Sequence, residues 1–157
     1  MKVALAVVAL AIAAVIFLGF FRGRSEGKEL TYFYDLSEKK LFPAPRNSIA
    51  PIRGINDAEQ DAVRAIVIST TGNPKDKANR KIAYLETCSP ELKAQLEAAQ
   101  SGNTAAVPPR GVRQALMLVR RLEEADWYPV SSAEGEKIMT EWQMPGPGGK
   151  APVVCAP

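Results

Sequence analysis

The sequence predicts an α+β fold, in which an N-terminal transmembrane helix precedes a small antiparallel sheet with about two helices packed on one face. Three observations predict it. An uncharged apolar run opens the chain, strand-like segments follow between residues 31 and 88, and two capped helical segments come later. Strands that precede helices in this way are typical of the α+β class, and 157 residues suffice for one domain.

The opening apolar run, VALAVVALAIAAVIFLGFF, covers residues 3–21 and contains no charged side chain. A helix of that length, rising about 1.5 Å per residue, extends roughly 28 Å and nearly matches the hydrocarbon core of a bilayer. A cleaved secretory signal has a shorter apolar region that ends in a small-x-small site, whereas this run ends in two phenylalanines and Arg22. We therefore expect residues 1–21 to be an uncleaved signal anchor, a single-pass transmembrane helix with the lipid bilayer as its partner.

The basic residues on the two sides of this run disagree about its orientation. One lysine precedes the run, while two arginines and a lysine follow it within residues 22–30, which by the positive-inside rule places the domain in the cytoplasm. A single lysine before an apolar run is, in contrast, typical of an export signal anchor, and two glutamates interrupt the second basic group. We expect an inner-membrane protein with its domain outside the cytoplasm and with residues 22–30 as a polar linker.

The stretch TYFYDLSEKKLFPAP, residues 31–45, predicts a β-hairpin at the start of a domain that extends over residues 31–143. Side chains alternate between two faces in TYFYDL, SEKK interrupts the pattern, and Pro43 and Pro45 end the second strand. The segment APRNSIAPIRGIND has no sustained period and predicts an extended surface connector.

Two further strands follow the connector. DAVRAIVIS, residues 61–69, is a β-branched run, and KIAYLETC, residues 81–88, returns after the polar loop TTGNPKDKANR. Two such segments joined by a loop of about ten residues predict an antiparallel pair. The candidate inward residues are Ile66, Ile68, Ile82 and Tyr84.

The segment CSPELKAQLEAAQSGN predicts the first helix of the domain. Ser89 takes the N-cap position and Pro90 the first helical position, and both residue types favour a helix start there. Leu92, Leu96 and Ala99 recur on one face, and we expect that face to pack on the sheet.

The segment VRQALMLVRRL, residues 112–122, fits either a helix or a buried strand. We expect a strand, because EEADWYPV after it predicts a turn and a short return strand. A second helix follows in SSAEGEKIMTEWQM, where Ser131 and Glu134 have the spacing of a capping box. Its apolar side is expected to contain Ile138, Met139 and Trp142. Residues 144–157 are rich in proline and glycine and predict a tail without a helix.

Several classes of chemistry are excluded by what the chain lacks. It has no histidine, which excludes Ser-His-Asp and Cys-His catalysis, histidine-ligated haem and most catalytic zinc sites. The glycine-rich motifs that bind phosphate groups, G-x-x-x-x-G-K-[ST] and G-x-G-x-x-G, do not occur in the sequence. A net charge of +3, with basic residues scattered among acidic ones, does not favour nucleic acid as a partner. We therefore expect a non-enzymatic protein with no cofactor, no metal and no nucleic-acid partner.

The two cysteines, Cys88 and Cys155, are 67 positions apart, which excludes C-x-x-C redox chemistry. Two alternatives stay open for them. A disulfide would close a long loop, contribute up to about 4 kcal/mol and fix the tail beside the first helix. Alternatively, Cys88 is a small buried apolar side chain and Cys155 a free thiol.

Carboxylates and aromatic residues are the remaining candidates for a site. The carboxylates form two groups, the first with Asp57, Glu59 and Asp61 and the second with Glu123, Glu124 and Asp126. Neither has the spacing of a calcium loop, so we expect solvated charges. The aromatic candidates for a partner or ligand surface are Tyr32, Tyr34, Trp127, Tyr128 and Trp142. Burial against the sheet is the usual role of such residues.

The motifs YFYDLSEKKLFPAP, IAPIRG, VRAIVI and KIAYLETCSPELKAQLE, followed by VRRL and WYPVSSAEGEKIM, resemble a group of uncharacterised bacterial proteins with one N-terminal span. The resemblance covers residues 31–143 and rests on a Y-D-L hairpin, a proline connector and a Y-L-E strand before an S-P-E helix. It implies the domain boundary and brings no known activity or catalytic residue.

Two hypotheses about function follow. The first is a membrane-anchored, non-enzymatic interaction or accessory subunit of a larger membrane or envelope assembly, whose other proteins are its partners. The second is a small anchored ligand-binding or hydrolytic domain that uses carboxylates and aromatics of the hairpin sheet. It is favoured by a deep pocket with any of these residues in its wall: Tyr32, Tyr34, Asp35 or Glu86.

Overall fold

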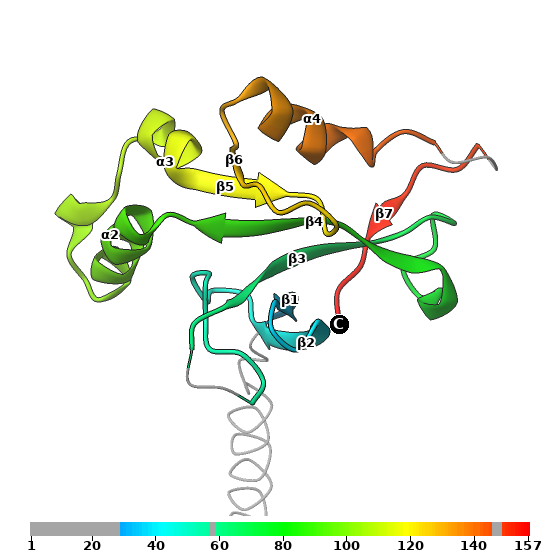
Figure 1. The fold of residues 1–157 in the computed structure, drawn as a ribbon, viewed down its shortest axis with the longest axis horizontal. Coiled ribbons are helices and arrows are strands. Elements are labelled where there is room, and N and C mark those ends of the chain that lie inside the picture. Colours follow the sequence, from blue (N-terminus) through cyan, green and yellow to red (C-terminus); the bar gives the residue numbers. More distant parts are fainter. Residues whose placement is uncertain (1–28, 57–58, 146–148) are drawn as a thin grey trace, which may run out of the picture.

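The computed structural model describes residues 29–56, 59–145 and 149–157. Within them the chain forms one antiparallel sheet of seven strands with three α-helices, which fits the α+β class (Figure 1). The strands are β1 (Leu30–Asp35), β2 (Lys40–Pro45), β3 (Ala62–Ser69), β4 (Arg80–Cys88), β5 (Met117–Arg120), β6 (Tyr128–Pro129) and β7 (Val153–Val154). The helices are α2 (Pro90–Gln100), α3 (Arg110–Leu116) and α4 (Ala133–Glu141), with short 3-10 turns at Lys77–Asn79 and Thr104–Ala106. The strand order is β2-β1-β3-β4-β5-β6, and β7 also pairs with β3.

The predicted hairpin is confirmed in β1 and β2, which pair along their whole length. On its other side β1 pairs with β3, so the hairpin continues into the main sheet. Phe33 is fully buried between the hairpin and the connector, with Ala44 and Ala50 beside it. The ring of Phe42 lies 6.2 Å from the Phe33 ring, centroid to centroid. The alternating aromatics of β1 therefore serve partly as core.

The predicted antiparallel pair is confirmed in β3 and β4, but its register shifts between Ile66 and Val67. Ile66 lies opposite Tyr84, whereas Val67 lies opposite Ile82. Residues two apart share a face in a regular strand, but the bulge adds one residue and turns Tyr84 and Ile82 to opposite faces. Tyr84 packs in a cluster with residues of α4, and Ile82 packs with Val67 on the other side. The expected inward residues are thus divided between two faces.

Helix α4 packs on the sheet. Its Ile138 is fully buried against Tyr84 and Val119, and Met139 and Trp142 extend the same cluster, as the sequence predicts. Helices α2 and α3 lie instead at the end of the sheet where β4 leads into α2 and α3 leads into β5 (Figure 1). The expectation of two helices packed on one face is therefore corrected to one helix on the face and two at the end.

The helix caps are set by serines. Ser89 caps α2 as predicted, because its side chain accepts a hydrogen bond from the backbone N–H of Leu92. The N-cap of α4 is Ser132, one residue later than the predicted Ser131, and it accepts from the backbone N–H of Gly135. The capping-box spacing therefore identified the helix but not its first residue.

Residues 112–122, for which the sequence fits a helix or a strand, form part of each. Helix α3 continues to Leu116, and the backbone becomes extended at Met117, where φ is −87° and ψ is 130°. The four residues of β5 then pair with the last four of β4. The expected strand is correct only for β5, because pairing with β4, not the local pattern, sets where the helix ends.

The tail contributes a strand of its own. Val153 and Val154 form β7 and pair with Ser69 and Ile68 of β3. The backbone N–H of Cys155 then donates to the carbonyl of Val67, 2.8 Å away. Strand β7 therefore occupies the same edge of β3 as β1, further along it.

The predicted transmembrane helix over residues 3–21 lies outside the described residues. In the part of the chain that the structure describes, no helix is long and apolar enough to cross a membrane. Helix α2, with 11 residues, extends only about 16 Å, whereas a hydrocarbon core is about 30 Å thick. The expected fold class is therefore corrected to an α+β fold in which no described helix could span a membrane, and the same finding contradicts the predicted single-pass signal anchor and inner-membrane location.

Candidate functional site

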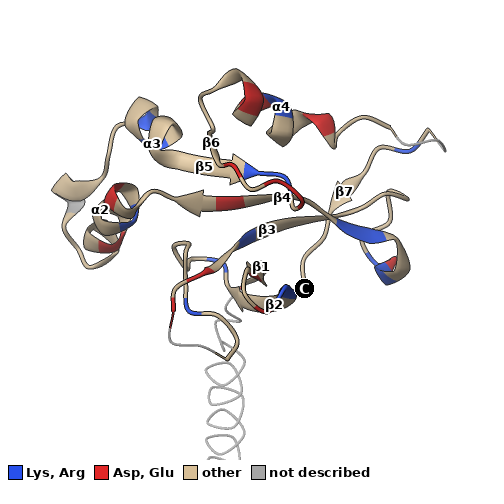
Figure 2. Cartoon of the chain, in the orientation of Figure 1, with Lys and Arg blue, Asp and Glu red and all other residues tan. Residues whose placement is uncertain are grey.

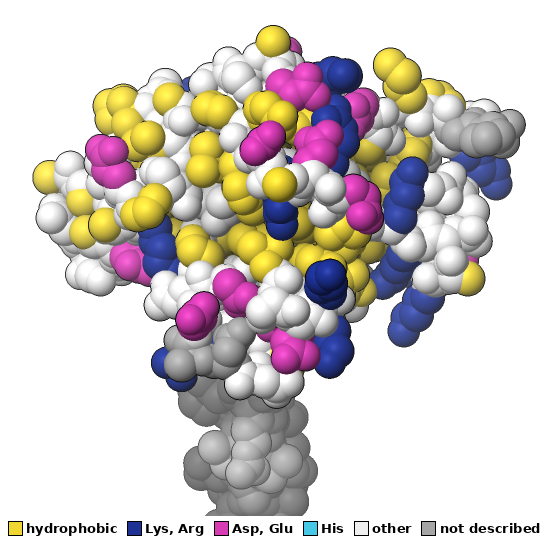
Figure 3. Space-filling view, viewed as in Figure 1, with side chains coloured by type: hydrophobic (Ala, Val, Ile, Leu, Met, Phe, Trp, Pro, Cys, Tyr) yellow, Lys and Arg dark blue, Asp and Glu magenta, His cyan; other side chains and the backbone are white. Residues whose placement is uncertain are grey.

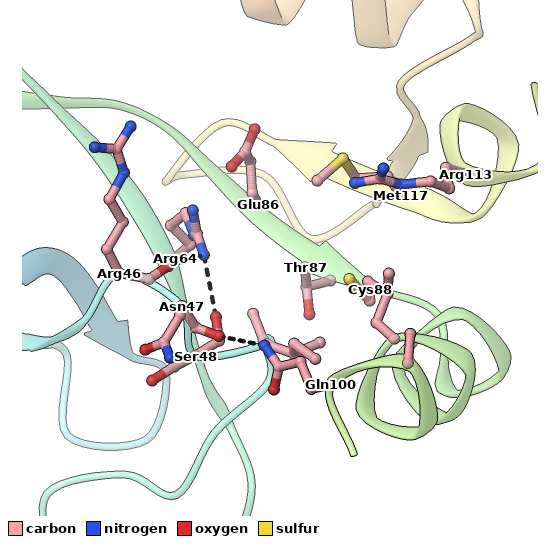
Figure 4. Close-up of a pocket in the computed structure, with 14 residues that line it drawn as sticks. Arg46, Asn47, Ser48, Arg64, Glu86, Thr87, Cys88, Gln100, Arg113 and Met117 are labelled. Carbon is pink, nitrogen blue, oxygen red and sulfur yellow. Dashed lines mark hydrogen bonds between the residues drawn. The ribbon is translucent and has the colours of Figure 1, made fainter. Parts of the chain in front are cut away.

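A cavity of about 450 Å³ lies between the connector, the sheet and helix α2 (Figure 4). Its wall combines charged and apolar side chains. The charged ones are Arg46, Arg64, Glu86 and Arg113. The apolar ones are Ile49, Ala50, Leu96, Ala99 and Met117. A cavity of this size and mixed lining suits a small ligand.

The connector is fixed as one wall of this cavity by contacts to α2. Lys93 donates from Nζ to the carbonyls of Ile49 and Pro51. Gln100 donates from Nε2 to the carbonyl of Asn47, 2.8 Å away. Of the predicted apolar face of α2, Leu96 and Ala99 border the cavity, whereas Leu92 is buried.

The far end of the connector is held by Asp35. Its side chain is completely buried, and its Oδ2 accepts a hydrogen bond from the backbone N–H of Ile55 at 2.7 Å. Its Oδ1 accepts from the backbone N–H of Glu38 and from the hydroxyl of Ser37, both at 2.8 Å. These hydrogen bonds, first those from Glu38 and Ile55, lower the pKa of Asp35 because they favour the ionised carboxylate. Asp35 thus positions the hairpin and the connector and is not part of the cavity wall.

Arg64 is the best-positioned cation of the cavity. Its Nη2 donates to the carbonyls of Arg46 and Ser48, at 2.9 and 3.0 Å. Its guanidinium carbon lies 5.9 Å from the centroid of the Phe33 ring, within the range of a cation–π contact. Both hydrogen bonds use one nitrogen, so Nε and Nη1 make no hydrogen bond to any other described residue. A fixed guanidinium with open N–H groups suits a carboxylate or phosphate.

Glu86 is the acidic residue of the cavity wall. It is the direct partner of Arg64 in the register of β3 and β4. No ion pair joins these side chains to each other or to another described residue. Burial raises the pKa of Glu86, and the opposing effect of the Arg64 charge is smaller. The cavity wall therefore holds a desolvated carboxyl group beside a guanidinium whose Nη2 is bound to connector carbonyls and not to that carboxyl group.

The cysteines are both free thiols, and both are buried. Cys88 borders the cavity, whereas Cys155 packs with Val63, Ala65 and Val67 on the other face of the sheet. The disulfide alternative is therefore not what the structure shows. Burial raises the pKa of the Cys88 thiol, and nearby positive charges, Arg64 first, only partly offset that effect.

The aromatic candidates lie outside the cavity wall. Tyr32 accepts a hydrogen bond from Nη1 of Arg80 at 2.7 Å, and Arg120 stacks over Trp127 at 4.8 Å from its ring. Tyr32, Tyr34 and Trp127 are half-buried on the face of the sheet that carries Val67. Tyr128 and Trp142 pack beneath α4. Of the four residues named for a pocket, only Glu86 lines this one.

The two carboxylate groups do not form a metal site within the described residues. Asp57 lies outside those residues. Asp61 accepts from the backbone N–H of Ser37, 3.0 Å from its Oδ2. Glu124 pairs with Arg121 at 2.7 Å, in a network that also contains Glu134 and Glu141. Basic and acidic residues are likewise mixed along the described elements (Figure 2).

The arginines and Gln100 are the functional candidates that sequence reasoning missed. Arg64 had a visible signal, because it is the single charge inside the otherwise apolar run AVRAIVIS of β3. A charge at that position must either face water or find partners. Arg46, Arg113 and Gln100 had no such signal, since their proximity depends on how the connector and the helices fold against the sheet.

Comparisons with protein-family models, with curated proteins and with solved structures found no match to the chain. The resemblance to bacterial single-span proteins therefore stays a prediction.

Proposed function

We propose that this chain is a non-enzymatic binding domain that holds a small organic ligand through an anionic group in the Arg64 cavity. The observation that carries the proposal is the guanidinium of Arg64, which is fixed by two carbonyls and the Phe33 ring and keeps N–H groups open at the cavity. Little side-chain freedom is then lost on binding, and this preorganisation favours affinity.

The charges and the shape of the cavity support the same ligand class. Three arginines and one glutamate line it, so its charge favours a carboxylate or phosphate. The apolar side chains from the connector, α2 and β5 favour a carbon skeleton beside that group.

Binding is favoured over catalysis by the protonation state of Cys88, the candidate nucleophile of the cavity. Cys88 is the cysteine of the cavity wall, and burial raises its pKa. The thiolate is the reactive form, so a raised pKa keeps the side chain in its unreactive form near neutral pH. With no histidine in the chain, no imidazole is present to remove the proton.

The test is isothermal titration of the full-length chain with four probes: 4-methylvalerate, succinate, L-leucine and inorganic phosphate. We expect at least one to bind and to raise the unfolding free energy, by about 2.7 kcal/mol at a hundred times its Kd. Arg64→Gln should abolish that binding, and Arg113→Gln, which does not touch the connector carbonyls, should weaken it several-fold. The matched control is Arg110→Gln, an exposed arginine of α3 outside the cavity wall.

Two results would contradict this proposal. One is the absence of binding for all four probes to a folded protein, judged by circular dichroism. The other is binding that Arg64→Gln and Arg113→Gln both leave unchanged, because the ligand would then occupy a different site.

A second function, an interaction or accessory subunit, is supported by the opposite face of the sheet. Tyr32, Tyr34 and Trp127 are half-buried there, together with Leu36 and Leu122. Apolar side chains also gather across the middle of the molecule between charged ones (Figure 3). Native mass spectrometry after affinity purification tests this function: a stoichiometric partner lost in Trp127→Ala would support it, and a chain that migrates alone would count against it.

A further inference from the structure

We infer that the ligand of the Arg64 cavity is an α-amino acid with an apolar side chain, whose carboxylate meets Arg64 and whose ammonium group meets Glu86. This inference rests on the proposed function and adds the chemistry of the ligand. It starts from the arrangement of these two side chains, which project from directly opposite positions on β3 and β4 into the same cavity.

Directly opposite residues of an antiparallel pair have Cβ atoms about 4.5–5.5 Å apart, which is close enough for an ordinary ion pair. None forms, because Nη2 of Arg64 is turned toward the connector carbonyls of Arg46 and Ser48. Figure 4 shows Glu86 pointing away from the dashed bonds that hold Arg64. Each charged group is therefore left with capacity to bind something else.

Glu86 decides between an anion and a zwitterion. A ligand with only a carboxylate would place a second negative charge close to Glu86, and like charges in a partly desolvated site repel strongly. An ammonium group beside the carboxylate removes that repulsion and gives Glu86 a cationic partner. The two charged groups of an α-amino acid are bonded to the same carbon, and so short a separation suits partners that come from two neighbouring strands.

The rest of the cavity indicates the side chain of the ligand. Leu96 and Ala99 from α2, Ile49 from the connector and Met117 from β5 provide apolar surface next to the charged pair. An aliphatic or thioether side chain would remove this surface from water.

The experiment compares three probes that differ by one group. L-leucine carries both charges, 4-methylvalerate lacks the ammonium group and 3-methylbutylamine lacks the carboxylate. L-methionine and L-phenylalanine test other apolar side chains. In isothermal titration of the full-length chain at pH 7, we expect at least one of the three amino acids to bind ten-fold or more tightly than both single-charge probes.

The variant Glu86→Gln should reduce amino-acid affinity about ten-fold and leave 4-methylvalerate unchanged or bound more tightly. Glu123→Gln, an exposed carboxylate outside the cavity wall, is the matched control and should change neither. Circular dichroism of each variant confirms folding.

The outcomes separate this inference from the proposed function. If 4-methylvalerate binds as tightly as the amino acids, and Arg64→Gln abolishes it, the zwitterion is overturned while the anion site stands. If none of the three amino acids binds, the inference is overturned, and phosphate or succinate then decides the fate of the proposed function.

Discussion

Arg64 and Glu86 are direct partners in the register of β3 and β4, and both side chains line the same cavity. Arg64 is held by backbone carbonyls of the connector, and Glu86 is held by no other described side chain. An opposite-charge pair on neighbouring strands usually contributes to the stability of a sheet. Here the two charges form no ion pair, so other interactions in the fold must offset the free-energy cost of burying Glu86.

Glu86→Gln should stabilise the protein at neutral pH. Burial raises the pKa of Glu86 above its ordinary value of 4.5, so its contribution to stability is full below that value and is lost as the pH rises through the folded-state pKa. The charged or titratable groups around it are Arg64, Tyr84, Cys88 and Arg113, and burial raises the pKa of Tyr84 and of Cys88, away from this pH range. Urea unfolding from pH 4 to 8 should show a decline in wild-type stability that the variant lacks; a parallel decline in both would contradict this.

Asp35→Asn should remove a source of acid sensitivity. Backbone hydrogen bonds from Glu38 and Ile55 lower the pKa of Asp35 below its ordinary value of 3.8. Its stabilising effect is therefore present above that value and is lost as the pH falls through the folded-state pKa. The variant should be less stable at pH 7 and should lose less stability between pH 5 and 2. Asp126→Asn, at an exposed turn residue, is the control and should show the wild-type profile.

Ile138→Ala should cost about 2–5 kcal/mol of unfolding free energy, because it leaves a cavity between α4 and the sheet. Ile138 is fully buried against Tyr84 and Val119. The control is Val112→Ala in α3, where the side chain is 41% exposed and the expected loss is below about 0.5 kcal/mol. Chemical denaturation measures both; equal losses would mean that α4 does not pack as described.

Gly135→Ala should destabilise α4 although alanine favours helices. A Cβ atom at Gly135 would lie 2.1 Å from the carbonyl oxygen of Pro129, so the helix or strand β6 must move. Gly111→Ala in α3 is the matched control, since nothing lies within 4 Å of its Cβ position. That variant should gain up to about 1 kcal/mol from helix propensity. Thermal unfolding should therefore move in opposite directions for the two variants, and a stabilised Gly135→Ala would be inconsistent with this helix position.

The elements that the sequence predicts well are those fixed by local signals. Alternation in TYFYDL predicts β1, a β-branched run predicts β3, and Ser89 with Pro90 predicts the start of α2. Each of these signals depends on residues a few positions apart, so it does not depend on how distant parts of the chain fold.

What the sequence does not predict depends on partners far along the chain. The bulge that separates Tyr84 from Ile82 is a property of the pairing between β3 and β4. Strand β7 exists because Val153 and Val154 meet an open part of β3, which their proline- and glycine-rich surroundings do not indicate. The cavity wall likewise combines the connector, α2 and two strands, so its arginines could not be grouped in advance.

Strand β2 forms the outermost strand at one side of the sheet, and it contains Pro43 and Pro45. A proline has no N–H, and two prolines at alternate positions remove donors from the same side of the strand. Since β1 occupies the inner side, the missing donors are those that a strand from another molecule would need. Sheet growth by addition of a second chain is thus obstructed along this border, which protects the protein from self-assembly into fibrils when it is concentrated.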